Sequence, residues 1–281
     1  PVIGPTAAGW AGEVIVLVSY AFMATALVTG GTSGIGAAFA KELARRGFDL
    51  VLVARDAERL EGEAERYRAA GRRVEVLVAD LADRADVQRV AARLEDRQRP
   101  VEVLVNNAGF SVRARLTDPD VAEHDRAFEV MMRAVLVLSG AAARAMRERG
   151  HGSIVNVSST AGFITMGAYS AIKAWVTAYT EGLAGELHGT GVRVMALAPG
   201  WVHTEFHERA GVPVSGIPEA LWIDADELVA AAMKDLVRGR VVSIPTVRYK
   251  SLMFLARHAP RGGVRAVSRA LSGRRSSSLQ S

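Results

Sequence analysis

The sequence predicts an α/β fold in which a parallel, doubly wound sheet of about seven strands is covered by helices on both faces. Short runs rich in β-branched residues alternate with amphipathic helical stretches from Ala24 onward. The runs are apolar nearly throughout, as is typical of strands buried on both faces of a parallel sheet. No linker or internal repeat precedes the serine-rich end at 276–281. The pattern therefore predicts a single domain.

The strands are expected where these apolar runs fall. Their residue ranges are 26–29, 49–54, 73–79, 101–106, 153–158, 193–198 and 240–245. The helices are expected where apolar residues recur at helical spacing. Their ranges are 34–46, 57–70, 84–97, 121–149 and 168–188. Gly47 and Gly71 directly follow two of these helices, where glycine commonly ends a helix.

Both ends of the chain are expected to lie outside this domain, which spans 23–247. Val14 to Val28 is apolar, but it is short for a membrane span and has no basic residues before it, so we interpret residues 1–22 as an N-terminal extension. Residues 248–281 hold eight of the 35 Lys and Arg residues and no acidic one. This tail is expected to be a solvated helix, and weak contact with an anionic membrane surface is the alternative.

Composition excludes several classes of function. The absence of cysteine excludes disulfides, thiolate metal sites and a cysteine nucleophile, and it favours a cytoplasmic location. His203 and His207 lack the H-E-x-x-H order of a zinc protease, so we expect no metal. Without the tail, the formal net charge of +5 becomes 27 basic against 30 acidic residues, so we expect no nucleic-acid partner.

The turn after the first strand, "TGGTSGIG" (29–36), favours a phosphate-binding loop. Gly30, Gly34 and Gly36 allow a tight turn, close approach of the backbone to a phosphate, and close packing of the next helix on the strand. The amides and dipole of that helix N-terminus favour a pyrophosphate. A glycine turn between a strand and a helix indicates a Rossmann-like nucleotide-binding fold.

The stretch "AYSAIK" places Tyr169 and Lys173 four residues apart on an expected helix, where both face the same way. A tyrosine that packs and a lysine that reaches water would satisfy this pattern. The functional interpretation is a proton donor beside the cation that tunes it. The rest of the chain decides between the two.

Four motifs, "TGGTSGIG", "NNAG" (106–109), "YSAIK" (169–173) and "PGWVHT" (199–204), occur in the order and separation of the short-chain dehydrogenase/reductase family. The sequence resembles that family from about Met23 to Pro245. The resemblance implies an oxidoreductase that transfers hydride between a nicotinamide dinucleotide and a carbonyl or alcohol substrate. It favours the functional interpretation of Tyr169 and Lys173.

The resemblance also implies roles for individual residues. Asp80, with Leu81, follows the third strand, where the family's acidic residue hydrogen-bonds the adenine amino group. The nicotinamide carboxamide is expected at Thr204 and near Val202. The implied cofactor-binding residues are Gly30, Thr32, Ser33, Gly34, Ile35, Gly36, Arg55, Asp80, Leu81, Asn107, Ala108, Gly109, Tyr169, Lys173, Pro199, Gly200, Val202 and Thr204.

The end of the second strand favours NADP(H) over NAD(H). A carboxylate there would accept the ribose hydroxyls of NAD, but that position holds Ala54, and Arg55 follows. A guanidinium suits a 2′-phosphate. Asp56 is an acidic neighbour that lies past the strand end, and a solvated Arg55 at a helix start is the alternative.

The reacting centre implied by the resemblance is Ser159, Tyr169 and Lys173. Tyrosine with a pKa near 10 is a poor acid–base catalyst at neutral pH, so we expect Lys173 to lower it, aided by the charge of the oxidised nicotinamide. Ser159 would hold the substrate oxygen. Ser158 is the alternative, although adjacent residues on a strand face opposite ways.

The sequence departs from the family pattern at two places. Only ten residues separate Ser159 from Tyr169, so the loop between them is shorter than usual. In the long helix, Met131 stands where the family normally carries an asparagine that kinks the helix and holds a water linking the lysine to solvent. Methionine cannot replace that hydrogen bonding. A dinucleotide-binding sensor or scaffold with impaired catalysis is therefore the alternative function.

Substrate specificity is expected in residues 205–222, which are apolar and act as a lid over a lipophilic carbonyl or alcohol compound. The alternative is that these residues only cover the core. The long helices over 121–149 and 168–188 are those that the family pairs, so a homodimer or homotetramer is expected.

Overall fold

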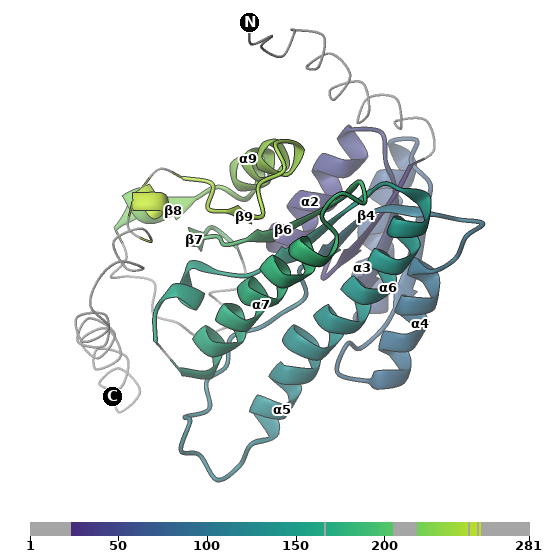
Figure 1. The fold of residues 1–281 in the computed structure, drawn as a ribbon. Helices are drawn as coiled ribbons and strands as arrows, with labels where there is room; N and C mark the ends of the chain where they lie inside the picture. Colours follow the sequence, from purple (N-terminus) through teal and green to yellow (C-terminus); the bar gives the residue numbers. More distant parts are fainter. Residues whose placement is uncertain (1–23, 166, 205–217, 247, 252, 254–281) are drawn as a thin grey trace, which may run out of the picture.

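A seven-stranded parallel sheet forms the centre of the molecule, with the strand order β3-β2-β1-β4-β5-β6-β9 (Figure 1). The computed structural model describes residues 24–165, 167–204, 218–246, 248–251 and 253. The order reverses between β1 and β4, as in a doubly wound sheet. The fold class expected from the sequence is confirmed. The N-terminal extension, most of the lid and most of the basic tail lie outside the described residues.

The strands follow the apolar runs. They are β1 (Thr25–Thr29), β2 (Asp49–Ala54), β3 (Val74–Val78), β4 (Val101–Asn106), β5 (Gly152–Val157), β6 (Val192–Leu197) and β9 (Val242–Ser243). The bounds of β2 and β4 are those expected. The last strand is shorter than the expected 240–245, because only two of its residues pair with β6, at Ala196 and Leu197.

Two sets of helices cover the two faces of the sheet (Figure 1). One face carries α2 (Gly34–Arg45), α3 (Ala57–Ala69) and α9 (Ala225–Val237). The other carries α4 (Arg84–Leu94), α6 (Ala134–Arg149) and α7 (Gly167–Glu186). Successive strand residues alternate between the two apolar clusters: Val51 packs with α4 and α6, and Leu52 packs with α2 and α3. Burial on both faces explains why the strands read as continuous apolar runs.

The long helix expected over 121–149 is three segments. α5 (Ala122–Phe128) continues into a π-helical turn, η1 (Glu129–Arg133), before α6 begins. The residue at the centre of that turn is Met131, which is 1% exposed. π-Turns insert one extra residue into a helix and occur frequently at functional sites. The periodicity of the sequence did not reveal the extra residue.

Five further elements were not expected from the sequence. They are α9, the 3-10 helix η2 (Thr160–Phe163), the 3-10 helix η3 (Glu219–Leu221), and a small parallel pair of β7 (Trp201–Val202) and β8 (Trp222–Ile223). Tyr249 braces the small pair, since its hydroxyl donates to the Leu221 carbonyl at 2.8 Å and accepts from the Trp201 N–H at 3.1 Å.

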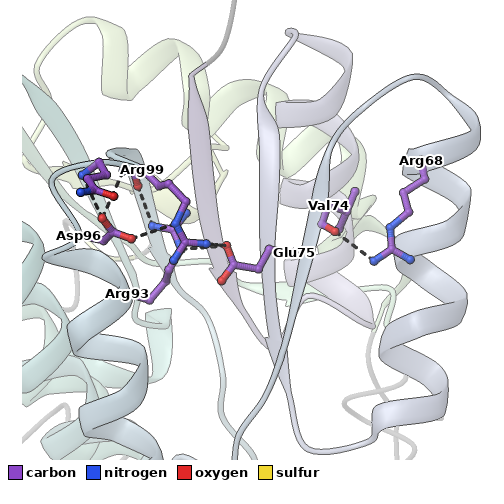
Figure 2. Close-up of polar contacts among 7 residues, drawn as sticks. Arg68, Val74, Glu75, Arg93, Asp96 and Arg99 are labelled. Carbon is purple, nitrogen blue, oxygen red and sulfur yellow. Dashed lines mark hydrogen bonds and ion pairs between the residues drawn. The ribbon is translucent and has the colours of Figure 1, made fainter.

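Arginine side chains cover the outer edge of β3, the edge strand of the sheet. Arg68 donates to the Val74 carbonyl at 3.0 Å, and Arg89 donates to that of Val78 at 2.9 Å (Figure 2 shows the first). Arg93 is buried, and its Nε donates to Glu75 on the same strand at 2.9 Å. These guanidiniums occupy edge acceptors with which another strand would pair.

Candidate active site

The carboxyl ends of the central strands open onto a cavity of about 960 Å³. Ligands bind at this edge of doubly wound sheets, where the strand order reverses. The cavity is lined by every site residue expected from the sequence except Gly36. These are Gly30, Thr32, Ser33, Gly34, Ile35, Arg55, Asp80, Leu81, Asn107, Ala108, Gly109, Ser159, Tyr169, Lys173, Pro199, Gly200, Val202 and Thr204.

Gly36 lies behind the cavity wall, where the helix packs on the glycine turn. A Cβ there would lie 2.1 Å from the Gly30 carbonyl oxygen, so a larger residue would push α2 away from β1. Gly30 has φ +66°, and a Cβ on it would lie 2.9 Å from Asn107 Nδ2. Asn107 in turn donates to the carbonyls of Thr29 and Gly30, at 3.1 and 3.2 Å. The glycines thus let the turn pack closely on the β4 loop.

Thr204 lies over the start of α2. A Cβ on Gly34, whose φ is +53°, would be 3.1 Å from Thr204 Cβ. The chain leaving β6 therefore reaches across the N-terminus of α2, where free amides and the helix dipole favour an anion. The described part of the expected nicotinamide segment, Pro199 to Thr204, borders the same cavity as the glycine turn.

Two arginines flank the cavity beyond the end of β2. Arg55 is exposed, as expected for a residue that follows the strand. Arg59, one helical turn later, donates from Nε to the Thr32 carbonyl at 3.1 Å and lines the same cavity. Asp56 caps α3 by accepting from the Arg59 N–H at 3.0 Å, so its carboxylate has a structural role. The sequence analysis missed Arg59, although its i,i+4 spacing from Arg55 was visible.

Asp80 meets an arginine that the sequence analysis also missed. Arg126 Nη2, from α5, lies 3.1 Å from Asp80 Oδ1 and 2.8 Å from Oδ2. Burial opposes ionisation of Asp80, but the hydrogen bonds from Arg126 and the Ala82 N–H outweigh it and hold the pKa of the carboxyl below its usual value. Asp80 lies two residues beyond the end of β3 and not on it.

Ser159, Tyr169 and Lys173 come together at the end of β5 and the first turns of α7. The Ser159 hydroxyl hydrogen-bonds to Tyr169 and accepts from the Ala161 N–H at 3.1 Å. Lys173 is buried, and its Nζ donates to the Val157 carbonyl at 2.8 Å and lies 5.6 Å from the centre of the Tyr169 ring.

The pKa of Tyr169 is not lowered in this structure, contrary to the expectation. Burial raises the pKa of Tyr169 to about 12, against a smaller lowering by the Ser159 hydroxyl. Burial also lowers the pKa of Lys173 to about 8, because its ammonium is withdrawn from water. The lysine is therefore a weaker source of positive charge than an exposed one, and the tyrosine stays protonated at neutral pH.

Ser158 faces away from Tyr169 and supports α7. Its Oγ donates to the Lys173 carbonyl at 2.7 Å and lies 2.7 Å from Thr177 Oγ1. The short loop to Tyr169 is held by Gly162, at which a Cβ would lie 2.8 Å from the backbone of Lys173 and Ala174. The geometry therefore favours Ser159 over Ser158.

Met131 fills the space behind the "NNAG" turn. Its Sδ would lie 3.1 Å from a Cβ on Gly109, so the thioether packs directly on that glycine. The helix keeps an irregular turn at this position without the family's asparagine. Methionine supplies the volume of that residue but no amide.

Apolar side chains form part of the cavity lining. They include Phe110, Val112, Ile164 and Trp201, and Arg113 is among the polar residues. Trp201 packs against Trp222 with ring centres 5.9 Å apart, and His203 stacks on the same Trp222 at 4.6 Å. Gly200 is required here because a Cβ would lie 2.0 Å from the Tyr249 ring. From the predicted specificity segment 205–222, residues 205–217 lie outside the described ranges.

Within the residues that the structure describes, no three His, Cys, Asp or Glu side chains form a group suited to a metal ion. In the same residues, no helix combines the length and hydropathy required to span a bilayer.

Comparison with known proteins identifies the family. The family model for short chain dehydrogenase matches residues 24–212. Gluconate 5-dehydrogenase of Gluconobacter oxydans is 33% identical over 237 residues, covering 79% of this chain and 93% of that protein.

Two solved structures resemble the whole fold. A short-chain dehydrogenase from Sphingobium yanoikuyae in complex with NADPH has a TM-score of 0.75 and 37% identity, covering 92% of this chain and 95% of that one. The bulky-bulky ketone specific alcohol dehydrogenase from Comamonas testosteroni has a TM-score of 0.72 and 34% identity, covering 83% and 92%. The chain therefore belongs to the short-chain dehydrogenase family of oxidoreductases.

Proposed function

We propose that the protein is an NADP(H)-dependent oxidoreductase that interconverts a carbonyl and a secondary alcohol, with Tyr169 as the acid and base. The observation that carries this proposal is the meeting of Ser159, Tyr169 and Lys173 in one cavity with the glycine turn. The alternative of a scaffold without turnover depended on Met131. It is not favoured, because all three reacting groups are retained and the relatives reported above are dehydrogenases.

The cavity fits a dinucleotide. Its length runs from Asp80 and Arg55, past the glycine turn, to Tyr169 and Thr204. Gly30 and Gly34 have φ +66° and +53°, which lets the turn before α2 adopt the tight conformation that a phosphate-binding loop requires. Ser170 lines the same cavity, and its buried hydroxyl has no hydrogen-bond partner among the residues that the structure describes, which is consistent with a ligand as its partner.

The reaction follows from the three side chains. Bound NADPH supplies hydride to the carbonyl carbon, and NADP⁺ accepts it in the reverse direction. Tyr169, which is protonated at neutral pH, donates its proton to the carbonyl oxygen. Ser159 hydrogen-bonds to the same oxygen and so places it beside the phenol. Lys173 holds its ammonium beside the ring and favours the phenolate that proton transfer leaves.

The preference for NADP(H) is supported by two guanidiniums. Arg55 and Arg59 line the cavity beyond the end of β2, and the Asp56 carboxylate between them accepts from the Arg59 N–H as the cap of α3. A 2′-phosphate gains charge-assisted hydrogen bonds from such a pair. Two related structures contain NADP or NADPH according to their descriptions.

The substrate is a lipophilic carbonyl or alcohol compound. Phe110, Val112, Ile164 and Trp201 supply an apolar part of the cavity lining, as is common in small-molecule pockets. The related Comamonas enzyme is described as specific for bulky-bulky ketones, which supports a wide pocket of this kind.

The active protein is a homodimer or homotetramer that buries the outer face of α6 and α7. Leu136 of α6 is 48% exposed, and Phe128, the last residue of α5 in the same helical run, is 44% exposed. Trp175 and Tyr179 of α7 stack at 5.0 Å, and the Tyr179 hydroxyl donates to the Leu136 carbonyl. Exposed apolar patches of this kind mark association surfaces. The contact of the basic tail with membranes and the cellular location stay predictions.

Replacement of the tyrosine tests the proposal. Tyr169→Phe removes the phenolic proton that is transferred to the substrate oxygen, so we expect turnover to fall by about 10²–10⁴-fold with NADPH affinity within about twofold of wild type. NADPH binding is measured by thermal shift, and turnover by loss of NADPH absorbance with a panel of ketones and aldehydes.

Tyr67→Phe is the matched control, since Tyr67 is a half-buried tyrosine of α3 outside the cavity. It should turn over at the wild-type rate. A Tyr169→Phe protein as fast as this control would refute the assigned acid and base, and a wild-type protein that fails to bind NADPH would refute the proposed function itself.

A further inference from the structure

We propose that Arg126 is a positioning residue that fixes the carboxylate of Asp80 for recognition of the adenine amino group. The inference rests on the proposed function, because it assumes that a dinucleotide occupies the cavity with its adenine at Asp80. Arg126 and Asp80 both line that cavity, from α5 and from the turn after β3.

The contacts of Asp80 leave one acceptor position for a ligand. A carboxylate offers about four lone-pair positions. Oδ1 accepts from the Ala82 N–H at 3.0 Å and from Arg126 Nη2 at 3.1 Å. Oδ2 accepts from Arg126 at 2.8 Å. The remaining position lies on Oδ2, and a carboxylate oxygen can use it only to accept a hydrogen bond. An exocyclic amino group is a donor and fits, whereas a carbonyl oxygen at the same place would be repelled.

The orientation of this carboxylate is set by Arg126 together with the backbone. The Asp80 N–H donates to Asp86 Oδ2 at 2.8 Å, which holds the main chain of the turn, and the Ala82 N–H holds Oδ1. Without Arg126, Oδ2 would have no partner from the protein among these contacts and could rotate away. Arg126 also stabilises the ionised form of Asp80, since its guanidinium helps to hold the pKa of Asp80 below the usual value.

The position of Arg55 supports the placement of an adenosine here. Its charge acts on Asp80, so the guanidinium proposed for the 2′-phosphate and the carboxylate proposed for the adenine belong to one neighbourhood. An adenosine 2′-phosphate carries the phosphate that Arg55 would bind and the adenine that Asp80 would bind on adjacent parts of one nucleoside.

A nearby ion pair provides a matched control. Arg84, at the start of α4, donates to Glu129 of η1 at 2.6 Å. This pair joins the start of α4, four residues after Asp80, to η1, which directly follows the helix that carries Arg126. Neither Arg84 nor Glu129 lines the cavity. Removal of Arg84 therefore removes a neighbouring brace without touching the carboxylate of Asp80.

The experiment compares the affinity of the full chain for NADPH and for reduced nicotinamide hypoxanthine dinucleotide phosphate, in which a carbonyl replaces the adenine amino group. Wild type should bind NADPH more tightly than the hypoxanthine analogue. Arg126→Ala should weaken NADPH by about tenfold, the effect of losing a hydrogen bond to a charged group, and should bring the ratio of the two affinities close to one. Arg126→Lys should retain part of the preference for NADPH, because a single nitrogen of Arg126 contacts both carboxylate oxygens of Asp80. Arg84→Ala should keep the wild-type ratio.

Three results would overturn the inference. They are a wild-type protein that binds NADPH without discriminating between the two dinucleotides, an Arg126→Ala protein that weakens both by the same factor, and an Arg84→Ala protein that loses the ratio as Arg126→Ala does. Failure of wild type to bind either dinucleotide would overturn the proposed function, so the two failures are distinguishable.

Discussion

At the scale of single residues, burial of Lys173 has a cost that the free protein carries at neutral pH. Its pKa is about 8 in the folded protein and 10.5 in the absence of burial. Between these values the unfolded chain binds more protons than the folded one, so the free energy of unfolding rises with pH. Functional sites commonly carry such a cost, because a residue needed for activity replaces one that would make the folded protein more stable.

We predict that Lys173→Met stabilises the cofactor-free protein. The pKa difference corresponds to about 3 kcal/mol at pH 7, and loss of the hydrogen bond to the Val157 carbonyl offsets about 1 kcal/mol, so a gain of about 2 kcal/mol is expected. In Lys173→Met, the free energy of unfolding should no longer rise between pH 8 and pH 10.5. Urea unfolding across this pH range measures both the gain in stability and its dependence on pH. Lys234→Met, at an exposed position of α9, should keep the rise, and a Lys173→Met protein that also keeps it would contradict the assignment.

The two arginines beyond β2 give a second prediction at this scale. Arg55→Ala and Arg59→Ala should each lower the ratio of kcat/KM with NADPH to that with NADH by about tenfold, because each removes charge-assisted hydrogen bonds to a 2′-phosphate. Inhibition by 2′,5′-ADP should weaken in parallel, and inhibition by 5′-AMP should not. Arg66→Ala is the control, as Arg66 pairs with Glu63 on the same helix outside the cavity. An unchanged ratio in Arg59→Ala would limit phosphate recognition to Arg55.

At the scale of elements, the site depends on how closely η2 packs on α7. Gly162 of η2 meets the backbone of Lys173 and Ala174, which cannot move aside as a flexible side chain would. That contact sets the distance between Ser159, which begins η2, and Tyr169, which lies in the first turn of α7. The shortened loop between the two residues is thus compatible with a reacting pair.

We predict that Gly162→Ala reduces kcat by about tenfold or more, because a catalytic group displaced by a fraction of an ångström loses alignment. Circular dichroism and the thermal midpoint show whether the fold survives, and single-turnover rates show the catalytic loss. Gly182→Ala is the matched control on α7, since nothing lies within 4 Å of a Cβ there. It should raise stability by about 0.5–1 kcal/mol. Equal rates in the two variants would mean that this packing does not align the site.

At the scale of the whole molecule, a buried polar network joins the sheet to the helices of the expected association face. Asn106 of β4 donates to Asn156 of β5 at 2.9 Å and to Ser139 of α6 at 3.0 Å. Asn156 donates to Thr180 of α7 at 3.0 Å. A fully satisfied network of this kind specifies one arrangement of the elements, because each unpaired member would be costly in the core. The two helices therefore present a fixed outer face to a second copy.

We predict that Leu136→Glu dissociates the oligomer to monomers, since a charge in an apolar interface must be desolvated without a partner. Sedimentation velocity measures the change. Val78→Glu is the control, because Val78 is 41% exposed but lies on the edge strand β3 at the far side of the sheet. It should sediment like wild type. An oligomer that survives Leu136→Glu would place the interface elsewhere.

The sequence by itself determined the features that depend on neighbours along the chain. Mainly apolar runs predicted β2 and β4 to the residue, because strands buried on both faces of a parallel sheet are apolar along most of their length. The spacing of Gly30, Gly34 and Gly36 defined the turn, and the i,i+4 spacing of Tyr169 and Lys173 defined their common face.

Only the tertiary structure decided the features made by residues distant in sequence. Arg126 reaches Asp80 across 46 positions, and no local pattern records that contact. Ser159 is favoured over Ser158 because the Ser158 hydroxyl donates to the Lys173 carbonyl of α7. The pKa of Tyr169 depended on how deeply the fold buries it, which outweighs the lowering by the Ser159 hydroxyl. Local periodicity sets which elements form, whereas the partners, burial and charge of each side chain are set by how those elements pack.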